Sequence, residues 1–188
     1  MRQAPGPGHG EWVARLRERA RLDAEELLPR PPFGVFGLAA PQLRPIALAE
    51  AERVDGGWET ITLAYGDGAD PAGPFVTVTS AVMRPDAPGL GTEAELLDVI
   101  DQERNRLADH AGVDEEEPPG PPDYGQEEFL ASDVRVSGLV GRHGSVWAVR
   151  LRASGVMVTV AGRGVGPGSV QPGPVADLEP YLRGRSET

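Results

Sequence analysis

Apolar and polar residues alternate along positions 133–162 of the chain. Two short glycine-containing stretches, 141–144 and 153–155, interrupt the alternation. A period of two is typical of strands with one buried face, and short segments of this kind are typical of tight turns. The pattern therefore predicts three consecutive antiparallel strands.

The register of these strands follows from where the turns are placed. A loop at 142–143 pairs Val136 with Val149, and a loop at 154–155 pairs Val149 with Val160. Both pairings bring the same apolar side chains to one face, whereas a slip of one residue would divide them between two faces. The predicted apolar face consists of Val134, Val136, Trp147, Val149, Leu151, Val158 and Val160.

A helical pattern over residues 92–112 predicts the principal helix. Thr92 and Glu95 have the spacing of a capping box, in which each side chain accepts a hydrogen bond from the backbone amide of the other residue. Leucine and isoleucine residues recur at helical spacing from Leu96 onward, and Gly112 suits the end of the helix. The residues expected to face outward are Asp98, Asp101, Glu103, Arg104, Arg106 and Asp109.

Weaker patterns predict the other elements. Apolar residues recur at spacings of three and four between residues 11 and 28, which indicates an N-terminal amphipathic helix. Segment 175–182 suits a short C-terminal helix. The remaining strands are expected at 33–38, 45–54, 58–65 and 74–83, with the second and third of them joined as a hairpin.

Together these elements predict an α+β fold. We expect a mainly antiparallel sheet of about six or seven strands, with helix 92–112 packed on one face. Residues 10–183 would form a single domain, and the termini, 1–9 and 184–188, would be disordered. Within the domain, the acidic, proline-rich stretch 113–128 is expected to be a long exposed loop.

The amino-acid composition excludes several kinds of binding partner and catalytic chemistry. The 188 residues carry a net charge of −11, which argues against binding to nucleic acids or anionic membranes. The chain has no cysteine and no lysine, which excludes thiolate and Schiff-base chemistry, and its arginine-only basic content is typical of a high-GC bacterial genome. Neither a signal peptide nor a long apolar span is visible. We therefore expect a cytoplasmic protein without a metal or cofactor.

His143 is the histidine closest to a serine, Ser145, and Asp133 lies upstream of both. In the predicted register Asp133 faces Arg152, far from His143, so the three residues do not assemble a catalytic triad. We interpret His143 as a solvated turn residue and predict no catalytic residues.

The candidate site is a group of arginines on the face opposite the apolar one. Arg135 and Arg150 would face each other, with Arg152 and Arg163 nearby. Three interpretations remain open. The arginines could be solvated, which we favour. Residues 114–117 and 127–128 could fold back over them and neutralise them, or the face could bind an anionic ligand or an acidic partner.

These features favour a non-enzymatic binding or accessory module, acting on a protein partner or as a homodimer. The alternative is a small-molecule-binding protein or an enzyme with a pocket between the sheet and the helix. Such a site would depend on arginine, carboxylate, serine or tyrosine side chains alone.

Overall fold

The computed structural model describes residues 33–39, 43–54, 57–66, 73–83, 89–111 and 120–182; the side chains of 47–50, 52–58, 106–111 and 182 are outside the description. The strands are β1 (Phe36–Leu38), β2 (Arg44–Val54), β3 (Gly57–Gly66), β4 (Phe75–Val82), β5 (Asp123–Ala131), β6 (Val134–His143), β7 (Val146–Ala153), β8 (Val156–Arg163) and β9 (Pro172–Pro174). The helices are α2 (Glu93–Ala111), the 3-10 helix η1 (Pro167–Ser169) and α3 (Glu179–Leu182).

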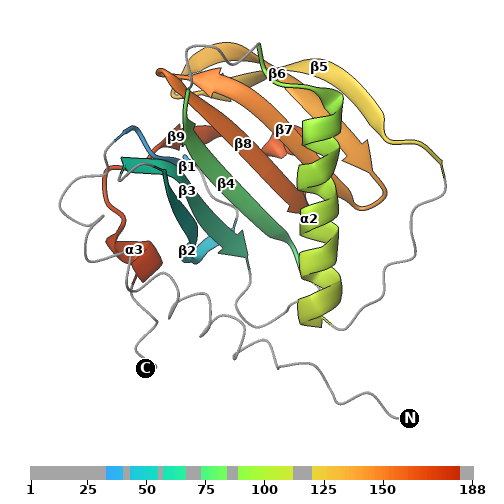
Figure 1. Ribbon diagram of the computed structural model, residues 1–188, viewed down its shortest axis with the longest axis horizontal. Coiled ribbons are helices and arrows are strands. Elements are labelled where there is room, and N and C mark those ends of the chain that lie inside the picture. Colours follow the sequence, from blue (N-terminus) through green and yellow to red (C-terminus); the bar gives the residue numbers. More distant parts are fainter. Residues whose placement is uncertain are drawn as a thin grey trace, which may run out of the picture.

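Seven strands form one antiparallel sheet in the order β2-β3-β4-β8-β7-β6-β5. Helix α2 packs on one face, against β6, β7 and β8 (Figure 1). We call this the helix face. The pair β1–β9 and helix α3 lie against the other, inner face, where the Phe36 amide donates a hydrogen bond to Ser80 Oγ at 2.8 Å. The α+β prediction of a mainly antiparallel sheet with a helix on one face is confirmed.

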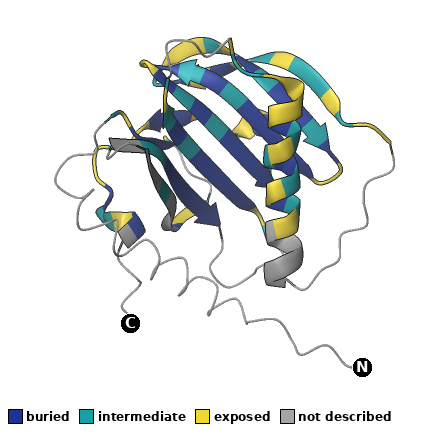
Figure 2. Ribbon diagram, in the orientation of Figure 1, coloured by how far each residue is buried: buried dark blue, intermediate teal, exposed yellow. Residues whose placement is uncertain are grey.

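The main core lies on the inner face. One cross-strand row from β3 to β6 contains Leu63, Val78, Val160, Val149 and Val140, each directly opposite the next. All five are buried (Figure 2). Since burying one such side chain stabilises the fold by roughly 1.5–3 kcal/mol, rows of this kind hold the sheet together.

The second predicted turn is confirmed and the first is wrong. The loop at 154–155 joins β7 to β8 and pairs Val149 with Val160, as expected. The loop between β6 and β7 consists of residues 144–145, so Val149 pairs with Val140 instead of Val136. Gly144 supplies the positive φ of this turn, at 66°.

Gly141 explains the error. The sequence pattern assigned it to the turn, but it lies within β6 beneath α2. A Cβ added there would lie 3.0 Å from Leu96 Cδ2 and 3.1 Å from Ile100 Cδ1. The glycine therefore allows the helix to approach the sheet closely, and its role depends on tertiary packing.

Helix α2 agrees closely with the prediction at its start. The Thr92 amide donates to Glu95 Oε2 at 2.9 Å and the Glu95 amide donates to Thr92 Oγ1 at 3.2 Å, which confirms the capping box. The outward orientation of Glu103 was wrong, since this residue is only 2% exposed. Its position continues the buried stripe of Leu96 and Ile100.

Other boundaries differ from expectation. The loop predicted at 113–128 ends earlier, because β5 begins at Asp123 and pairs with β6 along its whole length. The C-terminal helix, α3, is shorter than the predicted 175–182 and includes only Glu179–Leu182. The predicted helix 11–28, Gly112 and the terminal segments 1–9 and 184–188 lie outside the described residues.

Candidate functional site

The four arginines proposed as a site do not form one group. Arg150 lies opposite Leu139 on β6, while Arg135 pairs with Leu130 of β5, beyond the end of the β6–β7 ladder. The predicted pairing of Arg135 with Arg150 was wrong, because it depended on the misplaced turn. Arg152 lies opposite Met157 and is half-buried.

Arg150 is neutralised by the first turn of α2. Its Nη1 donates to Glu95 Oε2 at 2.9 Å, and its Nε donates to Thr159 Oγ1 at 3.3 Å. The hydrogen bond from the Thr92 amide, followed by the nearby Arg150 charge, holds the pKa of Glu95 below its usual range. Gly91 lies directly against this ion pair, so an external anion would have to displace Glu95.

Arg163 is neutralised deeper under the same helix. Its Nε lies 3.9 Å from Glu103 Oε1, and its guanidinium carbon lies 5.7 Å from the centre of the Phe75 ring. Its side chain is 10% exposed, compared with 82% for Arg135. The solvated interpretation therefore fits Arg135, whereas glutamates of α2 cover Arg150 and Arg163.

Of the acidic residues expected to fold back over the sheet, 114–117 lie outside the described residues, and 127–128 belong to a strand of the sheet. Glu127 and Glu128 lie in β5, where Glu127 accepts a hydrogen bond from Arg142 and Glu128 lies 3.4 Å from Arg135. Both ion pairs join β5 to β6. They neutralise neither Arg150 nor Arg163.

His143 is buried, contrary to the expectation of a solvated turn residue. Arg104 Nη2 lies 2.8 Å from His143 Nδ1, and His143 Nε2 lies 3.2 Å from the Gly120 carbonyl oxygen. Because a guanidinium can only donate, Nδ1 accepts and Nε2 carries the proton. His143 thus joins α2 to the residues leading into β5, a structural role in which both ring nitrogens are occupied.

The large sheet has two edge strands, β2 and β5, and the β5 edge is the surface with the clearest capacity to bind. β5 is the last strand in the order, and no strand among the described residues pairs with its outer side. The two-residue turn 132–133 closes the β5–β6 hairpin, so Ala131 and Val134 are a hydrogen-bonded pair. From there toward the start of β5, non-hydrogen-bonded and hydrogen-bonded pairs alternate. The residues whose backbone N–H and C=O groups point outward are consequently Tyr124, Gln126, Glu128 and Leu130.

Exposure along β5 agrees with an open edge. Gln126, Glu128 and Leu130 are exposed, and Leu130 is one of three large apolar residues classed as exposed within the described chain. A Cβ added at Gly125 would meet no heavy atom within 4 Å. At the end of the strand, the Ser132 amide donates to the Pro172 carbonyl at 3.1 Å, so β9 closes the edge there.

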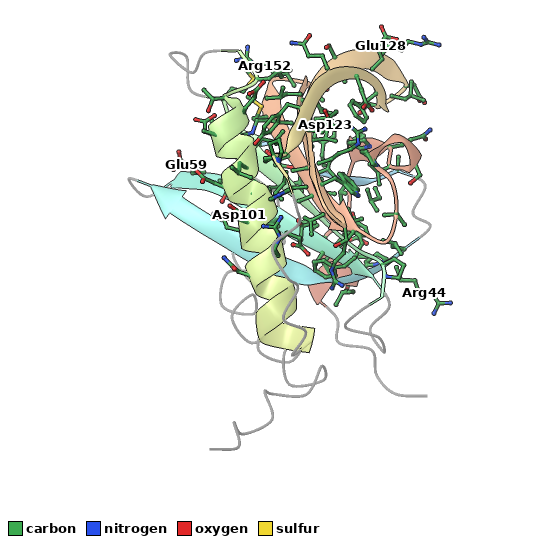
Figure 3. All side chains as sticks on the ribbon, turned by 90° about the vertical axis from the view of Figure 1, so that its right-hand side faces the viewer. Arg44, Glu59, Asp101, Asp123, Glu128 and Arg152 are labelled. Atoms are coloured by element: carbon green, nitrogen blue, oxygen red, sulfur yellow. The ribbon has the colours of Figure 1, made fainter. Side chains whose placement is uncertain are left out.

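Carboxylates surround this edge. Asp123, Glu127 and Glu128 lie on β5, and Asp101 lies on the neighbouring helix α2 (Figure 3). Burial raises the pKa of Tyr124, and the nearby charges of Glu93 and Asp101 raise it further. Carboxylates of both β5 and α2 therefore lie near this end of the strand.

Two further findings concern the described residues alone. No group of three or more histidine, aspartate or glutamate residues there has an arrangement that could hold a metal ion. None of the helices in that part of the chain is long and apolar enough to cross a membrane.

Sequence reasoning missed this edge because the pattern of β5 is weak. Only Phe129 and Ala131 are buried, at the end of the strand, whereas the preceding residues are polar or charged. The available signal was the short apolar run 129–131 directly before a turn. Comparison of the chain with family models, curated proteins and solved structures found no match.

Proposed function

We propose that this protein is a non-enzymatic interaction module that binds an extended segment of a protein partner along β5. The partner segment would become an eighth strand of the large sheet. In such strand addition, backbone hydrogen bonds supply affinity and the flanking side chains supply specificity.

The observation that carries the proposal is the exposed outer edge of β5. Its outward N–H and C=O groups, from Tyr124 to Leu130, have no backbone partner among the described residues and lie beside exposed side chains. Charged residues on an edge strand also protect a protein from aggregation, and the carboxylates of β5 suit this role too. Protection and selective binding are compatible, since both exclude unsuitable strands.

The alternative location, between the sheet and α2, is supported less well. Leu96 and Ile100 pack directly on Gly141, and Ala148 and Ala161 belong to the same buried cluster. This part of the interface is filled by apolar packing. Polar side chains also lie between the helix and the sheet, but there Glu103 pairs with Arg163, and Arg104 with His143.

The test uses a variant that blocks strand addition without disturbing the β5–β6 ladder. Gln126→Pro removes one outward N–H, and proline is tolerated on edge strands where its nitrogen faces away from the sheet. Gln126→Ala is the matched control, because it removes the side chain and keeps the amide. Both variants should retain the urea midpoint of the wild-type protein within about 0.5 M, as expected for an exposed position.

A library of short peptides would be selected for binding to the wild-type protein and rescreened against both variants. We expect the selected peptides to bind the Gln126→Ala variant and to lose binding to the Gln126→Pro variant. On binding, the amides of Gln126 and Glu128 should become protected from hydrogen exchange. Peptides that bind the proline variant equally well, or a selection that yields none, would contradict the proposal.

A further inference from the structure

We infer that the segment bound along β5 is basic, with arginine or lysine side chains on both faces of the added strand. This inference rests on the proposed strand-addition function and names the chemistry of its partner. It follows from how charges are distributed on the two faces of the edge strand.

On the inner face, two carboxylates flank a glycine. Asp123, Gly125 and Glu127 are alternate residues of β5 and share this face, and Gly125 leaves space beside its backbone. A residue of the added strand opposite Gly125 would lie diagonally across from both carboxylates, at about 7–8 Å between backbones, which is within reach of a long side chain. Both Asp123 and Glu127 would stabilise a cationic side chain at the position opposite Gly125.

On the helix face, the negative groups come from two elements. Glu128 is exposed on β5. Glu93 and Asp101 lie on α2, which packs in the same cluster as Tyr124, and their charges raise the pKa of Tyr124 after the larger effect of burial. A cation placed opposite Tyr124 or Gln126 would lie near these carboxylates and could also contact the tyrosine ring.

The nearby arginines offset these carboxylates only in part. Arg104, Arg135 and Arg142 pair with Asp101, Glu128 and Glu127, respectively. Asp123 and Glu93 make no ion pair within the described residues. In the sequence, four consecutive acidic residues, 114–117, precede β5, and the whole chain carries a charge of −11. A basic segment would therefore be attracted over a distance as well as held at the edge.

Charge also argues against a second copy of the chain as the occupant. Antiparallel pairing of β5 with another β5 would bring the same carboxylates together across the new ladder. Each copy carries a charge of −11 in addition, and this repulsion is not offset by other contacts at so small an interface.

The experiment compares two short peptides matched to β5 in length. Both have threonine and valine backgrounds, with arginine on both faces in one and glutamate at the same positions in the other. Binding is measured by fluorescence anisotropy at low and moderate salt. We expect the arginine peptide to bind at least about tenfold more tightly than the glutamate peptide, with a difference that shrinks as salt is added.

The protein variants identify the carboxylates responsible. Replacing them together as Asp123→Asn, Glu127→Gln and Glu128→Gln should weaken binding of the arginine peptide by about tenfold, since each exposed pair contributes modestly. Asp177→Asn is the control: it removes a carboxylate beside α3 and keeps a side chain suited to cap that helix. This control should bind like the wild-type protein.

The outcomes separate the inference from the function on which it rests. Equal binding of the two peptides, lost in the Gln126→Pro variant, would overturn the basic preference and leave strand addition intact. Failure of the arginine peptide to bind at all would overturn the inference. A wild-type dimer in sedimentation that is absent in the Gln126→Pro variant would identify a second copy as the occupant and overturn it as well.

Discussion

The ion pair between Glu103 and Arg163 allows a quantitative test of how α2 is held on the sheet. Glu103 is 2% exposed and the Arg163 side chain is 10% exposed, so water screens neither charge well and each helps to compensate the other. Removing one member of a buried pair costs about 3–5 kcal/mol, because an uncompensated charge remains buried. Replacing both members by apolar residues of similar size is often neutral or stabilising.

We therefore predict opposite results for single and double variants. Glu103→Leu should lower the free energy of unfolding by about 3 kcal/mol, and Arg163→Met should act similarly. The double variant should lie within about 1 kcal/mol of the wild-type protein, with the methionine still in contact with the Phe75 ring. With a urea m value of about 2 kcal/mol/M, each single variant should lower the midpoint by about 1.5 M.

Urea unfolding followed by tryptophan fluorescence measures these values, since Trp147 is buried and its Nε1 donates to the Val165 carbonyl. Midpoints can be compared in this way where all variants have the same m value. The reasoning would be refuted by a single Glu103→Leu variant as stable as the wild-type protein, or by a double variant that loses the sum of the two single effects.

Further predictions concern other contacts. Tyr65→Phe should cost about 1–3 kcal/mol in urea unfolding, because its buried hydroxyl binds both the Leu38 amide and the Tyr181 hydroxyl; Tyr181→Phe should cost less. Gly91→Ala should lower the melting temperature more than Gly89→Ala: both glycines have positive φ, but only at Gly91 would the new Cβ overlap an ion pair. The pKa of Glu95 is lowered in the folded state, so the ionised carboxylate stabilises the fold above pH of about 4.3, and this stabilisation is lost as the pH falls through the folded-state pKa. Glu95→Gln should therefore make the free energy of unfolding less dependent on pH in the acid range. Burial raises the pKa of Tyr65, so its contribution is complete below pH of about 10 and is lost at higher pH, a loss that should be absent in Tyr65→Phe.

The candidate site shows what sequence reasoning could and could not provide. The pattern identified arginines on one face of the meander, but their partners, Glu95 and Glu103, come from a helix far away in the sequence. Glu103 continues the stripe of Leu96 and Ile100, so its burial could have been inferred from helical periodicity. Its pairing with Arg163 could not, because that depends on how the helix lies on the sheet.

The sequence by itself determined the strands other than β5 and β9, the 154–155 turn and the capping box at Thr92, because each depends on residues close together in the chain. Only the tertiary structure decided the first hairpin register. Moving a turn by two residues, from 142–143 to 144–145, keeps every side chain on its face, so the alternation of apolar residues is the same for both. The packing of α2 on Gly141 distinguishes them. The edge position of β5 was likewise fixed by strand order, which depends on pairing between β4 and β8 across a long stretch of sequence.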